Sequence, residues 1–164
     1  MQDKKTALKQ LFYEWCQEEP SEILSLPYSG SHREYYRLKN QHLSAIGVYN
    51  ENFQENRAFI AMAQFFRRER ILVPTIYHEK PESNVYLTED LGNQNLFFKL
   101  RELHNSSHQQ KEIRHYVKKA LSELARVQVT GGRKLDFSVC YPTKEFNKSA
   151  VLYDLHYFRD QFLK

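Results

Sequence analysis

Val85-Tyr86-Leu87-Thr88-Glu89-Asp90-Leu91-Gly92 joins a short apolar run to an acidic, glycine-containing end. Apolar and β-branched residues over 85–88 predict a buried strand, and Asp90-Leu91-Gly92 predicts the turn that ends it. The sequence before this stretch is rich in short strand patterns, whereas the sequence after Gly92 has helical periodicity. We therefore predict two parts, residues 1–92 and residues 93–164.

The first part is predicted to fold as short antiparallel strands with one inserted helix. An apolar stripe at i, i+3, i+4 and i+7 predicts a helix over 3–18, and a second stripe predicts a helix over 54–70. The predicted strands are 23–26, 35–38, 42–49, 75–77 and 85–89, with a polar turn at 39–41 and a hairpin loop over 78–84. This order indicates an α+β fold with an antiparallel sheet of about five strands.

The second part is predicted to be helical. Helices are expected over 94–104, 108–128 and 148–163, and residues 133–147 are expected to be irregular. Thr130-Gly131-Gly132 is the expected C-cap of the long helix, because glycine favours the backbone conformation that ends helices.

Composition and charge exclude several classes of protein. The chain has 164 residues, of which 41% are apolar and 14% aromatic, so it can bury a core and is not disordered as a whole. Its net charge of +4 comes without a run of Lys and Arg, and its aromatic residues do not gather on one strand, so we expect no nucleic-acid partner. No signal peptide or membrane-spanning run is evident, which predicts a cytoplasmic protein without a membrane partner.

Metal and nucleophile motifs are missing. The seven His and two Cys are scattered, and neither H-E-x-x-H nor C-x-x-C occurs, so we expect no metal site. G-x-S-x-G is also missing, and Cys16 falls on the first predicted helix, where we interpret it as a buried structural thiol. We expect Cys16 and Cys140 to be reduced.

The turn Ser29-Gly30-Ser31 offers backbone N–H groups and hydroxyls to an anion. Alone it is a weak signal, since most such turns are only turns. Its context is more informative, because a helix with Glu55 near its start follows the third strand, and the last strand runs into an acidic-glycine segment. This is the element order of a kinase small lobe that leads into a large lobe.

These residues resemble the aminoglycoside phosphotransferase-like kinase family. Within it, the sequence is most similar to the sugar kinases that phosphorylate N-acetylmuramate and N-acetylglucosamine at the anomeric carbon. The resemblance is close over residues 20–130 and loose over 131–164. Its segments are Ser29–Leu38, Glu55–Phe59, Val73–Tyr77 and, most specifically, Val85–Gly92.

The resemblance implies roles for individual residues. The turn Ser29-Gly30-Ser31 would lie over the ATP phosphates, and backbone groups of Thr88, Glu89, Asp90 and Leu91 would hold the adenine. Glu55 would be the helix glutamate that normally pairs with a lysine of the third strand.

That lysine is missing, because Gly47 stands at about its place. The sugar-kinase branch is also expected to lack it. Arg33 or Arg37 would then supply the positive charge, unless both are exposed strand arginines, an alternative that the sequence leaves open.

The catalytic loop of the family is also missing. No H-x-D-x-x-x-x-N or D-x-D occurs, and we interpret Asp154 and Asp160 as surface carboxylates. The chain is therefore expected to be the N-terminal part of a longer ATP- and Mg²⁺-dependent kinase for a small acceptor such as an amino sugar, without catalytic residues or metal ligands of its own. The alternative is a non-catalytic, pseudokinase-like binding or regulatory module. Apolar helix faces at 113–127 and 151–162 would normally pack on the large lobe, so we expect them to drive homodimerisation or disorder.

Overall fold

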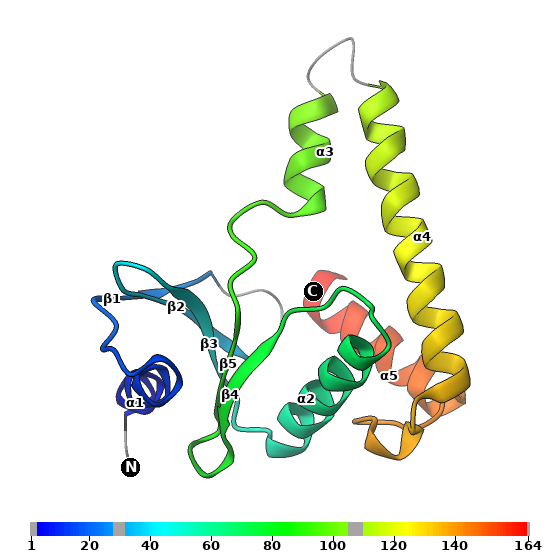
Figure 1. Cartoon of the computed structure of the whole chain (residues 1–164). Helices are drawn as coiled ribbons and strands as arrows, with labels where there is room; N and C mark the ends of the chain where they lie inside the picture. Colours follow the sequence, from blue (N-terminus) through cyan, green and yellow to red (C-terminus); the bar gives the residue numbers. More distant parts are fainter. Residues whose placement is uncertain (1–2, 28–31, 105–109, 164) are drawn as a thin grey trace.

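The centre of the molecule is one five-stranded antiparallel sheet with the strand order β1-β2-β3-β5-β4 (Figure 1). The computed structural model describes residues 3–27, 32–104 and 110–163. The helix α2 (Phe53–Arg68) connects β3 to β4. The predicted α+β class, its five strands and its inserted helix are therefore confirmed. The strands are β1 (Glu22–Ser25), β2 (Glu34–Lys39), β3 (Ser44–Tyr49), β4 (Ile76–Lys80) and β5 (Val85–Glu89).

One face of the sheet is covered by the N-terminal helix α1 (Lys4–Cys16). Its side chains Leu8, Leu11 and Phe12 are fully buried against Leu38 and Leu87 of the strands. Burying each such side chain stabilises the fold by about 1.5–3 kcal/mol. The apolar stripe read from the sequence is thus the core-facing side of α1.

The opposite face of the sheet is covered by α2. Ile60 of this helix is buried with Val48 of β3 and Tyr86 of β5. The N-cap residue Asn52 accepts a 3.1 Å hydrogen bond from the backbone N–H of Glu55, which satisfies one of the free donors at the helix start. Because strand side chains alternate between faces, α1 and α2 contact different residues of the same strands.

After β5 an extended segment leads to a pair of helices, α3 (Leu96–His104) and α4 (Gln110–Lys134), which lie side by side (Figure 1). A 3₁₀ turn, η2 (Phe137–Val139), and the helix α5 (Lys148–Phe158) follow. The last described residues form a π-helical turn, η3 (Arg159–Leu163). No helix in the part of the chain that the structure describes is long and apolar enough to cross a membrane.

The predicted glycine cap at 130–132 is wrong, because α4 continues to Lys134. Gly131 is buried, and a Cβ atom there would lie 3.4 Å from the Phe66 ring of α2. Because Gly131 has no side chain, α4 can approach α2 closely at this point. The Leu135 N–H still donates to the Gly131 carbonyl, as in a continuing helix. The glycine thus serves packing and does not end the helix.

Two loop boundaries also differ from the prediction. Residues 78–80 were expected in a hairpin loop, but they extend β4 and pair with β5. The turn itself is the 3₁₀ segment η1 (Pro81–Ser83), and Asn84 has the left-handed conformation. Pairing with the buried strand β5 therefore outweighs the polar composition of His78-Glu79-Lys80.

Candidate functional site

The end of β5 is tied to β2 through Arg37 and Asp90. The Arg37 guanidinium forms an ion pair with the Asp90 carboxylate, with Nε and Oδ2 2.8 Å apart, and its Nη2 donates to Oδ1 at 2.9 Å. The same guanidinium donates to the Asn93 side chain and to the Gly92 carbonyl. Ser44 of β3 donates to Asp90 Oδ2, the oxygen that Arg37 Nε also approaches. The segment that leaves the sheet is thereby fixed to two strands.

The ionised form of Asp90 is favoured in this network. Burial alone would raise the pKa of this carboxyl group, but hydrogen bonds from Ser44, the Gly92 N–H and Arg37 outweigh burial and lower the pKa below its ordinary value. Both partners of the ion pair are nearly buried, with side chains 10% and 9% exposed. Arg37 is therefore no exposed strand arginine, and both of its Nη groups donate within the protein.

A second ion pair joins the residue before β2 to the start of α2. The Arg33 guanidinium lies 2.8 Å from the Glu55 carboxylate and stacks over the Phe59 ring, 5.0 Å from its centre. Asn50 donates a further hydrogen bond of 3.0 Å to Glu55. The Arg33 side chain is 14% exposed, so the exposed-arginine alternative fails for this residue too.

Gly47 lies on the other face of the sheet. A Cβ atom at Gly47 would lie 2.6 Å from Leu38 Cδ1 and 2.7 Å from Leu8 Cδ2, so α1 fills the space that a side chain would need. The α2-facing positions of β3 are Ile46 and Val48. The structure thus separates Gly47 from Glu55, and α1 packing explains why no lysine stands at position 47.

The remaining predicted residues are spread along β5 and its end. Thr88 donates its hydroxyl to the Thr75 carbonyl, and the Glu89 carboxylate accepts from the backbone N–H and hydroxyl of Thr75. These bonds from Thr75 lower the pKa of Glu89. Leu91 is exposed. The turn Ser29-Gly30-Ser31 lies outside the described residues.

Ser44 and Asn93 are site residues that sequence reasoning missed. Ser44 pairs with Lys39 in the β2–β3 register, which places it diagonally across from Arg37. The β3–β5 register, in which Ala45 pairs with Glu89, brings the Ser44 hydroxyl to Asp90, so no sequence motif could indicate it. The one sequence feature that pointed to this site was the polar segment Asp90-Leu91-Gly92-Asn93.

A metal centre is not found in the described ranges, since no group of three or more His, Cys, Asp or Glu is placed to hold an ion there. Asp160 is exposed and forms an ion pair with its neighbour Arg159. Cys16 and Cys140 are free thiols and both are half-buried, so Cys16 is less enclosed than predicted.

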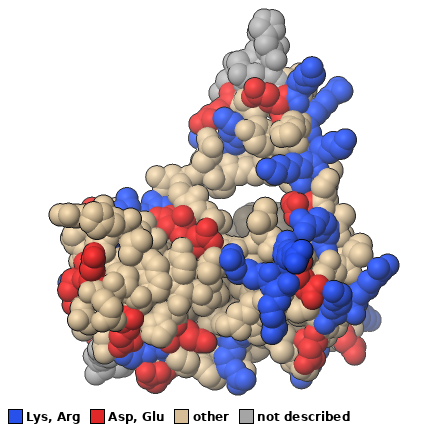
Figure 2. All heavy atoms as spheres, viewed as in Figure 1, with Lys and Arg blue, Asp and Glu red and all other residues tan. Residues whose placement is uncertain are grey.

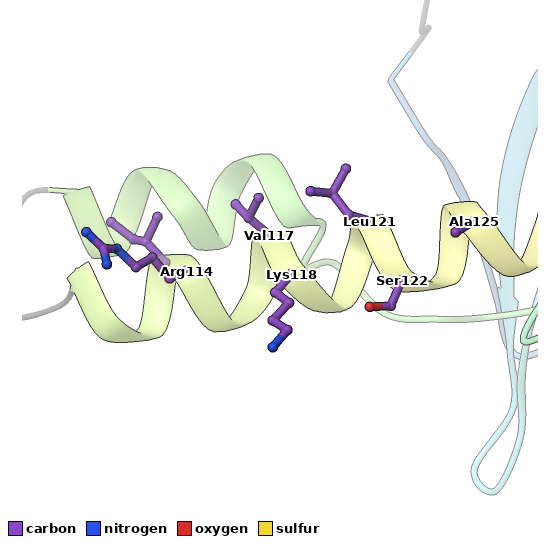
Figure 3. A pocket seen from close by; sticks show the side chains of 7 residues that line it. Arg114, Val117, Lys118, Leu121, Ser122 and Ala125 are labelled. Atoms are coloured by element: carbon purple, nitrogen blue, oxygen red, sulfur yellow. The ribbon is translucent and has the colours of Figure 1, made fainter.

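The helix α4 carries an apolar surface of its own. A shallow depression of about 490 Å³ runs along it, and Val117 and Leu121 project from one side of the helix and Lys118 from the other (Figure 3). Lys and Arg side chains gather over this part of the molecule (Figure 2). Leu121 and Leu124 are more than half exposed. This surface contains none of the predicted nucleotide-binding residues.

No known protein family matches the chain, and neither does any curated protein.

Proposed function

We propose that this chain is the N-terminal, nucleotide-binding part of an ATP-dependent small-molecule phosphotransferase, with an amino sugar as the class of acceptor. The observation that carries the proposal is the Arg33–Glu55 ion pair. It joins the segment before β2 to the helix that connects β3 to β4, in a sheet of order β1-β2-β3-β5-β4. A kinase small lobe needs an ion pair between a basic residue and the glutamate of this helix, and Arg33 takes the place of the usual third-strand lysine in that pair.

Arg33 is the cation that we assign to the phosphates. Kinases hold the α- and β-phosphates with a lysine of the third strand, and that lysine is positioned by a glutamate of the following helix. Here the α2-facing positions of β3 are apolar, whereas Arg33 reaches the helix glutamate from a neighbouring segment. An arginine suits this task because its guanidinium matches phosphate geometry with two parallel hydrogen bonds. Arg33 also stands only two residues after Ser31, the last residue of the Ser29-Gly30-Ser31 turn.

The segment after β5 is the assigned adenine site. Its backbone is held by Arg37, Ser44 and the turn in which Gly92 N–H donates to Asp90 at 3.0 Å. A segment that is fixed before binding loses less conformational freedom when a ligand arrives. The Arg37 network therefore supports adenine binding by positioning this backbone and does not contact the nucleotide itself.

The chemical step is not assigned to these residues. The described part of the chain holds no carboxylate cluster that fits Mg²⁺, and the sequence has no catalytic-loop motif. We therefore expect ATP binding without turnover, and we place the base and the metal ligands in a large lobe outside these residues. Under the pseudokinase-like alternative, a longer form of the protein would also transfer no phosphoryl group.

The test is ATP binding by isothermal titration calorimetry to the chain and to two variants. We expect Arg33→Gln to weaken ATP binding about tenfold, since a hydrogen bond to a charged group contributes about 1.5–3 kcal/mol. Lys119→Gln removes the same charge from the exposed side of α4 and should leave the affinity unchanged. No ATP binding, or equal weakening by both variants, would overturn the proposal.

A further inference from the structure

A second hollow, of about 440 Å³, lies between α2 and the segment that follows α4. This volume is in the range of small-molecule sites. Gln54, Ala58 and Ala61 line it from the side of α2 that faces away from the sheet, and Arg57, which also borders a small hollow beside Ile60, lines it from the flank of the helix. Cys140 and Lys144 line it from the other wall. It is therefore separate from the face of α2 that meets the sheet.

The charged side chains that line this hollow are both basic, and the Lys144 charge also acts on the Asp136 carboxylate outside it. Arg57 and Lys144 both line it, and among its described lining residues none is acidic. Arg57 lies over the Phe53 ring, but within the described ranges neither cation forms an ion pair. The nearby Asp136 carboxylate does not line the hollow and accepts from the backbone N–H of Ser138. A concave surface that is lined by positive charges concentrates anions.

Polar and apolar groups complete the wall. The Tyr141 hydroxyl accepts a 2.9 Å hydrogen bond from Asn52, which holds the ring in place and leaves the hydroxyl proton to donate. The Gln54 amide adds further donors. Ala58 and Ala61 provide a small apolar floor that suits carbon atoms. The hollow thus offers several donors at its rim and space for a carbon skeleton.

We propose that this hollow binds a small organic oxyanion, a phosphate monoester or a carboxylate, through Arg57 and Lys144. Arg57 presents the paired donors that match an oxyanion, and Lys144 supplies a second charge from the opposite wall. The ligand's carbon part lies on the alanine floor. The site shares no lining residue with the assigned nucleotide site, and Gln54, Ala58 and Ala61 lie on the side of α2 away from the sheet.

Cys140 gives a direct test, because its thiol lines the hollow and Cys16 does not. The probes are phenyl phosphate and benzoate, each compared with sodium chloride at equal ionic strength. We measure alkylation of each cysteine by iodoacetamide with mass spectrometry. At a probe concentration about ten times Kd, Cys140 alkylation should slow about tenfold while Cys16 alkylation is unchanged. Protection by phenyl phosphate alone assigns a phosphate ligand, and protection by benzoate alone assigns a carboxylate.

Two charge variants complete the experiment. R57Q/K144Q should abolish the protection, whereas R114Q/K118Q removes the same charge from α4 and should keep it. All four residues are exposed, so both variants should fold, which circular dichroism checks. Equal protection of both cysteines, protection in R57Q/K144Q, or no protection by either probe would overturn the proposal. Nucleotide binding by the unmodified protein is measured separately, and its failure would leave this result unaffected.

Discussion

The Arg37 guanidinium and the Asp90 carboxylate form an almost buried ion pair, with Nε and Oδ2 2.8 Å apart, although they are separated by 53 residues in the sequence. The pair joins the middle of β2 to the residue that follows β5. It fixes the direction in which the chain leaves the sheet toward α3. Its partners Ser44 and Asn93 extend the link to β3 and to the segment itself.

We expect Arg37→Met to lower the free energy of unfolding by about 3 kcal/mol, because it leaves Asp90 nearly buried without its cation. Asp90→Asn should destabilise the protein for the same reason. In the double variant the free energy of unfolding should fall by less than the sum of the two single losses, since the residues act as a pair. Urea unfolding of the four proteins measures this coupling. Lys39→Met, at the end of the same strand, is the control and should change the free energy by less than about 0.5 kcal/mol. Additive losses would contradict the paired role.

The pH dependence of stability should follow from the same carboxylate. The pKa of Asp90 is lowered in the folded protein from an ordinary value of 3.8, so its stabilising effect is fully present above that value. It is lost as the pH falls through the lower, folded pKa. The pKa of Glu34 is also lowered, by a hydrogen bond from Lys4 and one from Tyr36. Protonation of Glu34 therefore further reduces stability as the pH falls. We expect urea unfolding to show that, between neutral pH and pH values below 3.8, the free energy of unfolding falls more steeply with decreasing pH for the unmodified protein than for Asp90→Asn. Parallel curves would contradict the assignment.

A methyl group at position 47 should disturb the core. We expect Gly47→Ala to destabilise the protein by about 1–3 kcal/mol, because its Cβ would overlap Leu8 and Leu38. Gly132→Ala is the matched control, since nothing lies within 4 Å of a Cβ there and it stands inside α4. That change should stabilise the protein by about 1 kcal/mol. Thermal unfolding distinguishes the two, and an unchanged or raised melting temperature for Gly47→Ala would show that α1 does not pack tightly on β3.

Self-association should depend on the apolar surface of α4 and α5. Leu121 and Phe158 are at least half exposed, and a large exposed apolar surface favours association. We expect L121E/F158E to weaken any dimer at least tenfold in sedimentation velocity. Leu72→Glu, at a site 82% exposed in the loop after α2, should have no effect. A monomer at every concentration for the unmodified protein would contradict the homodimer expectation.

Local patterns were sufficient to predict most elements. The stripe of Leu8, Leu11 and Phe12 predicts α1 and its buried side, because helical period and burial are both local properties of the sequence. The strand pattern over 85–88 likewise predicts β5. Boundaries failed where a distant partner intervened, as at Gly131, whose role depends on Phe66 of another helix.

The sequence by itself determined the α+β class, the order of helices and strands and the charged residues from which a site could be built. Only the tertiary structure decided which charges meet. Arg33 pairs with Glu55, Arg37 pairs with Asp90, and Gly47 lies on the far face against α1. The reason is that strand register and the alternation of side chains between two faces are set by packing across the whole sheet, which no single segment encodes.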